Sequence, residues 1–65
     1  MGMVEVIIER WDNADGSTNF LWSVWSKGHR VHIGGKFDAA EAAEAEADQF
    51  CRQNFGAGPD RIRRL

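Results

Sequence analysis

Apolar and polar residues alternate along three stretches in the first half of the chain. The stretches are residues 3–11, 19–27 and 30–34, and all three are rich in β-branched or aromatic residues. Alternation with a period of two is typical of strands that bury one side. Asp15-Gly16 in the polar segment 12–18 and Gly28-His29 supply turns, because glycine and aspartate tolerate the backbone angles of tight turns. The pattern predicts a three-stranded antiparallel sheet.

The alternation also divides the strand residues between two sides of that sheet. We expect the buried side to carry the following residues: Val4, Val6, Ile8, Phe20, Trp22, Val24, Val31 and Ile33. The other side would display a second set: Ile7, Trp11, Leu21 and Trp25, with Arg30 and His32 from the third strand.

The segment after the strands predicts one helix. Asp38 is a good N-cap with Glu41 three residues on, an arrangement that resembles a capping box. Gly56 suits the C-terminal cap, and Pro59 prevents continuation. Small residues dominate a stripe at helical spacing, with one aromatic near its end: Ala39, Ala40, Ala43, Ala47, Phe50 and Cys51. Such a helix lies close to a sheet, and we expect Phe20 and Trp22 to fill the space beneath it.

The predicted fold is therefore α+β, in the order β-β-β-α, with the helix packed on one face of the sheet. With 65 residues, the chain forms at most one domain, residues 1–65. Its core would span 3–56. The basic tail, 57–65, forms either a short fourth strand or a frayed end.

The single cysteine and the hydropathy of the chain indicate which cellular compartment and which cofactors to expect. Cys51 is the single cysteine, so it cannot form an intramolecular disulfide, and we expect a small buried hydrophobe. One thiol and two histidines make a poor zinc site. No stretch is apolar for long enough to span a membrane, and the start of the chain lacks a signal-peptide pattern. We therefore expect a cytoplasmic protein without a metal or cofactor.

Charge is unevenly distributed along the chain. Residues 37–50 carry five acidic residues and no basic one, whereas residues 51–65 carry four arginines against Asp60.

The histidines do not indicate a catalytic site. His29 and His32 fall in a turn and a strand, and no spacing pairs a nucleophile with a base. We expect a binding protein rather than an enzyme.

The segment from Val31 to Ala43 reads Val-His-Ile-Gly-Gly-Lys-Phe-Asp-Ala-Ala-Glu-Ala-Ala. It resembles the third strand and helix start of the AP2 DNA-binding family, and it is similar to the arm-binding domains of phage integrases. The resemblance implies that the uncovered side of the sheet enters the DNA major groove, with arginine and tryptophan as the contacting residues. Glu5 and Glu9 depart from that pattern, because a DNA-reading strand would carry arginine there.

Two functions fit the uncovered side of the sheet. As a protein-interaction module, binding a partner or a second copy in a homodimer, it would use these residues: Ile7, Trp11, Leu21, Trp25, Arg30 and His32. A large exposed apolar patch is uncommon on a monomer. As a nucleic-acid-binding module it would use Trp25 together with the following bases: Lys27, Arg30, Arg61, Arg63 and Arg64. The bases on the strands, Lys27 and Arg30, are balanced by Glu5 and Glu9, so the tail arginines would have to reach this side. In a third arrangement, Ile62 and Leu65 fold over the patch.

Overall fold

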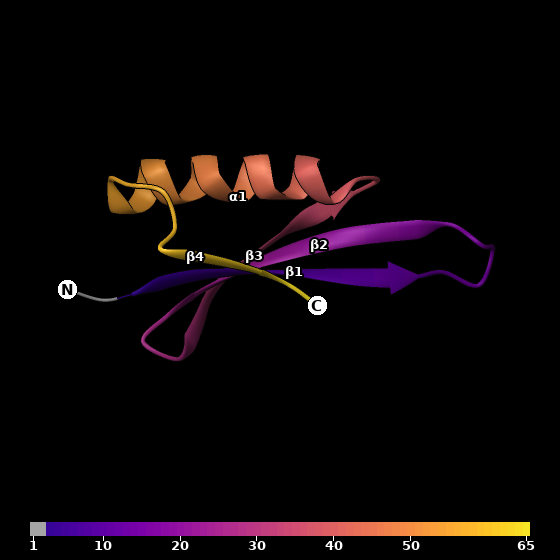
Figure 1. Cartoon of the computed structure of the whole chain (residues 1–65), viewed down its shortest axis with the longest axis horizontal. Coiled ribbons are helices and arrows are strands. Elements are labelled where there is room, and N and C mark those ends of the chain that lie inside the picture. Colours follow the sequence, from indigo (N-terminus) through magenta and orange to yellow (C-terminus); the bar gives the residue numbers. More distant parts are fainter. Residues whose placement is uncertain (1–2) are drawn as a thin grey trace.

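Four strands and one helix form two layers in the computed structural model, which describes residues 3–65 (Figure 1). The elements are β1 (Val4–Asp12), β2 (Thr18–Ser26), β3 (His29–Phe37), α1 (Ala40–Phe55) and β4 (Arg61–Arg64). The sheet order is β3-β2-β1-β4. The predicted α+β class and helix position are confirmed, and the tail forms the short fourth strand. Met1 and Gly2, the start of the predicted domain, lie outside the described residues.

β1 and β2 form a long regular hairpin that extends beyond the helix (Figure 1). Their register runs without a break from Val4 opposite Ser26 to Asp12 opposite Thr18. In the connecting turn, the Asp15 carboxylate accepts hydrogen bonds from the backbone N–H and the hydroxyl of Ser17, at 2.9 and 2.6 Å. These bonds hold the pKa of Asp15 below its usual value. The turn is therefore closed by local side-chain hydrogen bonds, as its polar sequence predicts.

β4 lies beside β1 and runs parallel to it, with Ile62 opposite Val6. Asp60 attaches the start of this strand twice: the Val4 N–H donates to its carboxylate, and its own N–H donates to the Val4 carbonyl, both at 2.8 Å. At the other end, the Leu65 N–H donates to the Ile8 carbonyl at 2.9 Å. The tail thus extends the sheet at its edge and does not fold over the uncovered side.

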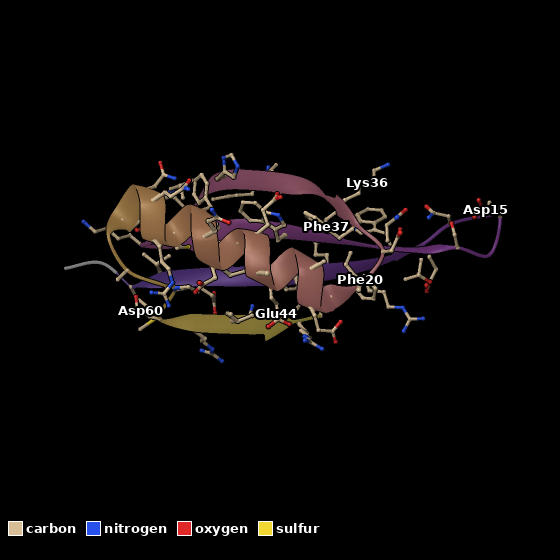
Figure 2. All side chains as sticks on the ribbon, turned by 90° about the horizontal axis from the view of Figure 1, so that it is seen from above. Asp15, Phe20, Lys36, Phe37, Glu44 and Asp60 are labelled. Atoms are coloured by element: carbon tan, nitrogen blue, oxygen red, sulfur yellow. The ribbon has the colours of Figure 1, made fainter. Side chains whose placement is uncertain are left out.

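The core lies between α1 and the near face of the sheet. Its buried apolar residues are Val6, Ile8, Trp22, Val24, Ala40, Ala43, Ala47 and Cys51. Phe20 and Phe37 are partly buried against this cluster, and in Figure 2 they lie near the first turn of the helix. The short side chains on the helix leave the volume to the sheet, so the predicted role of Phe20 and Trp22 as fillers is confirmed.

Cys51 is a buried free thiol at the end of the helix stripe. Burial raises its pKa, and the nearby carboxylates of Asp48 and Asp60 add to the effect. The thiolate form is disfavoured, which fits a packing role rather than a reactive one. Among residues 3–65, no helix is long and apolar enough to cross a membrane.

The predicted helix cap at Asp38 is wrong, whereas the cap at Gly56 is confirmed. The N-cap is Ala39, with an extended backbone and no side-chain hydrogen bond. β3 continues to Phe37, and the turn from this strand into the helix takes Asp38 and Ala39. Asp38 therefore lies one position before the N-cap, too early for its carboxylate to cap the first turn of the helix. Ala39, predicted within the buried stripe, is exposed. Gly56 has φ 79°, and its N–H donates to the Arg52 carbonyl at 3.2 Å.

The predicted orientation of β3 is inverted at His32 and Ile33, which follow a register shift, whereas Arg30 lies on the predicted side. Ile33 pairs with Ser23, so it lies on the side away from the helix, and it is 54% exposed. Val31, also predicted to be buried, is exposed at a register shift. His32 pairs with Val24 and therefore lies on the helix side, where its ring stacks on Phe50 with a centroid separation of 4.1 Å.

Trp22 explains this orientation. The register shift between Leu21 and Ser23 sets Trp22 against Gly34 and Gly35. A Cβ atom on Gly34 would lie 1.8 Å from the indole of Trp22, whereas a Cβ on Gly35 would meet nothing within 4 Å. The indole therefore occupies the space that a side chain at position 34 would need, and its Nε1–H donates to Glu46 at 3.3 Å.

We expect Gly34→Ala to destabilise the fold, because the methyl group would displace a tryptophan that is only 2% exposed. Overpacking of this kind costs typically about 1–3 kcal/mol. The matched control is Gly35→Ala, which should change stability by less than about 1 kcal/mol, since no atom lies in its way. Thermal unfolding followed by circular dichroism measures both variants. Equal melting temperatures for the two would contradict the role of Gly34.

Candidate binding face

One side of the sheet carries no helix, and we call it the open face (Figure 1). The strand registers place the following residues there: Glu5, Ile7, Glu9, Trp11, Asn19, Leu21, Ser23, Trp25, Arg30, Ile33, Lys36, Arg61 and Arg63. No segment between residues 3 and 65 covers it. The face includes Ile7, Trp11, Leu21, Trp25 and Arg30, which the alternation predicts for this side, and it adds Ile33.

A row of three charged residues and one tryptophan crosses one end of the open face. Arg61 lies opposite Glu5, Glu5 opposite Trp25, and Trp25 opposite Arg30. Glu5 forms ion pairs with Arg61 at 3.6 Å and with Arg63 at 3.3 Å, while the Arg30 guanidinium lies 6.0 Å from the centre of the Trp25 ring. Both cross-strand interactions fix side chains that would otherwise be free on an exposed surface.

Two isoleucines flank a buried serine in the middle of the open face. Ser23 lies between Ile7 and Ile33 in the next row, and it is only 6% exposed although no helix lies above it. The Trp25 indole donates a hydrogen bond from Nε1 to the Ser23 hydroxyl at 2.9 Å. The indole must therefore lean along its own strand, which shields this serine and satisfies its buried hydroxyl.

Two hollows open on this face, one at each end. The first has a volume of about 370 Å³, and its lining combines apolar side chains with one acid and two bases: Met3, Ile7, Trp25, Glu5, Lys27 and Arg63, with Gly28. The second, of about 250 Å³, lies near the hairpin and is lined by Trp11, Leu21, Lys36 and two asparagines. Trp11 is 55% exposed.

The open face is more basic than the sequence predicts. Four bases, Arg30, Lys36, Arg61 and Arg63, accompany two acids, Glu5 and Glu9. Lys36 lies opposite Leu21 on this side, because the second register shift restores the phase of Arg30 that the first shift changes. The two arginines reach this side because β4 joins the sheet. Alternation within residues 61–65 could have indicated that Arg61 and Arg63 share a side, but it could not say which side.

The remaining predicted site residues lie elsewhere. His32 lies on the helix side in an aromatic cluster with Trp22 and Phe50, so it is not part of the predicted patch. Arg64 also lies on the helix side, where it pairs with Glu44; Figure 2 shows Glu44 between the helix and β4. Lys27 lies in the β2–β3 turn with φ 55°, next to the first hollow.

The open face offers apolar surface and fixed charges. Within residues 3–65, no group of three or more His, Cys, Asp or Glu side chains is arranged to hold a metal ion. Comparison with family models, with curated proteins and with solved structures found no match to this chain.

We expect Glu5→Gln to loosen β4, because one carboxylate pairs with two arginines of this strand. Exposed ion pairs contribute about 0.2–1 kcal/mol each, and Glu5 forms two, so hydrogen exchange at the Asp60 and Leu65 amides should accelerate roughly two- to thirtyfold. The control is Glu9→Gln, because Glu9 takes part in none of the ion pairs found among residues 3–65. If both variants exchange like the wild type, the ion pairs do not hold β4.

Proposed function

We propose that this protein is a non-enzymatic interaction module that binds a protein partner or a second copy of itself through the open face. The observation that carries the proposal is the exposure of large apolar side chains on the side of the sheet opposite the helix. Trp11 is 55% exposed and Ile33 is 54% exposed, and Ile7, Leu21 and Trp25 are half-buried on the same side.

The arrangement of these side chains supports a protein interface. Apolar patches on small proteins commonly mark interaction sites, and tryptophan is enriched among the residues that dominate binding energy. Here the apolar residues come from β1, β2 and β3, and bases lie at the margins of the face on β3 and β4. An apolar centre with a charged rim is the usual anatomy of a protein–protein interface.

The tryptophans test this proposal. We expect Trp11→Ala, Trp25→Ala and Ile33→Thr to weaken self-association or partner binding, by about thirtyfold where the side chain is a hot spot worth about 2 kcal/mol. The control is Phe55→Ala, which removes an exposed aromatic side chain from the helix. Sedimentation velocity at several concentrations measures self-association, and circular dichroism checks folding.

Two results would contradict the proposal. One is association that stays the same in all three variants, and the other is equal weakening in Phe55→Ala. Trp25→Ala also removes the hydrogen bond to Ser23, which contributes to the fold itself, so Trp11→Ala and Ile33→Thr carry the decision.

One observation favours nucleic-acid binding as the second candidate. β4 brings Arg61 and Arg63 to the open face, where Lys36 also lies. The face then carries more basic than acidic side chains, and tryptophans that could stack on nucleobases come from its two central strands. The two acids weaken this candidate, because Glu5 already pairs with both arginines.

Salt dependence tests the second candidate. If the face contacts phosphates, the double variant Arg61→Gln with Arg63→Gln should reduce the slope of log K against log salt by about 1.8 for duplex DNA. Arg52→Gln is the control, since Arg52 lies on the helix and pairs with Asp48 at 2.7 Å. Fluorescence anisotropy with labelled random duplex DNA measures the slope. Binding that does not change with salt would exclude phosphate contacts.

A further inference from the structure

The two hollows on the open face share the same chemistry. In the first, Trp25 and Ile7 lie beside Lys27 and Arg63, with Glu5 as the one acid; two bases against one acid leave this hollow positive. In the second, Trp11 and Leu21 lie beside Lys36. Each hollow thus offers an aromatic and an aliphatic surface next to positive charge. An apolar side chain next to a carboxylate would match each of them.

We propose that the occupant of the open face is an extended, acidic segment of a partner protein that places one apolar side chain in each hollow. This inference rests on the proposed function and names the chemistry of the partner. The carboxylates of the segment would pair with Lys27 at one end, where Arg63 already pairs with Glu5, and with Lys36 at the other.

The spacing of the hollows suits an extended chain. Ile7 lines the first hollow and Trp11 lies in the second, and both belong to β1. Four residues of strand span roughly 13 Å, and side chains four residues apart point to the same side. A partner segment that runs along the face would therefore reach both hollows with its residues i and i+4.

Charge favours this partner over a second copy of the chain. The open face carries four bases and two acids, so two copies face to face would bring surfaces of the same sign together. The helix of a second copy is acidic, but between Glu41 and Gln49 it has no apolar side chain larger than alanine. That helix would supply carboxylates for the bases of the open face but no apolar side chains to occupy the two hollows.

The acids on the face favour a peptide over a nucleic acid. Glu5 and Glu9 lie among the bases, and Glu5 neutralises part of the charge of Arg61 and Arg63. Asn13 in the second hollow already donates to Asn19 at 2.7 Å and to Ser17 at 3.0 Å, which engages an amide that could otherwise read a nucleobase. Phosphate binding needs several unopposed bases, whereas an acidic peptide needs one or two near each anchor.

Three synthetic peptides of seven residues test the inference. The first has leucine at its second and sixth positions with glutamate on both sides of each leucine; the second replaces glutamate by lysine; the third replaces leucine by serine. The wild-type protein is titrated with each, and with oligothymidylate, while ¹⁵N–¹H spectra follow the Trp11 and Trp25 indole signals. We expect both signals to shift with the first peptide, and at least tenfold weaker binding of the other three probes.

A pair of variants checks the charge contribution. Lys27→Gln combined with Lys36→Gln should weaken the first peptide about three- to tenfold, because each rim pair contributes only modestly. Arg52→Gln on the helix should leave the affinity unchanged. Because Arg52→Gln removes one charge and the double variant removes two, a loss of binding free energy in Arg52→Gln of half that in the double variant, or more, would show that only net charge matters. That result would overturn the assignment of the hollows.

The outcomes separate this inference from the proposed function. If Trp11→Ala weakens self-association or partner binding but the first peptide does not bind, the open face is still an interface, and the proposal that its partner is an acidic segment is wrong. Equal binding of the lysine peptide would likewise overturn the acidic character of the partner. Tighter binding of oligothymidylate overturns the protein partner in favour of nucleic acid. If the tryptophan variants change no association and no peptide binds, both proposals fall.

Discussion

The close approach of the helix to the sheet is the constraint from which the other features follow. Ala40, Ala43, Ala47 and Cys51 form the inner surface of α1, so the backbone of the helix can lie near the strands. A helix with short inner side chains contributes little volume to the core, and the sheet must supply it. Trp22 is the largest residue in that cluster, and its indole is held between the helix and β3.

Holding Trp22 there sets the orientation of β3. The indole needs a residue without a Cβ atom beneath it, and Gly34 meets that need. Once Gly34 faces the helix, His32 does so as well, while Ile33 must point to the other side. A packing requirement inside the core therefore decides which side chains the protein displays outside it. The apolar centre of the open face is in part a consequence of how the helix packs.

Much of the fold is legible in the sequence, because its strands and helix obey their periodicities. β1 and β2 pair without irregularity, so simple alternation places Val6, Ile8, Trp11 and Trp25 on their correct sides. β3 contains two register shifts, and alternation cannot reveal a residue that is inserted opposite a partner strand. The same limit applies to β4, where only the pairing with β1 shows which side Arg61 and Arg63 occupy. Alternation therefore places Trp11 and Trp25 on the open face correctly. It does not place Ile33 there, nor does it decide the side of Arg61 and Arg63.

The sequence of β4 also bears on how copies of this protein behave in a crowded solution. The strand reads Arg-Ile-Arg-Arg and forms one border of the sheet, with its outer backbone groups free to pair. If two such borders came together, in parallel or antiparallel register, arginine would lie opposite arginine, and like charges in that position oppose pairing. Natural sheets use charged borders in this way to avoid stacking edge to edge into aggregates. β4 thus completes the sheet and also disfavours pairing of this edge with the same edge of another copy.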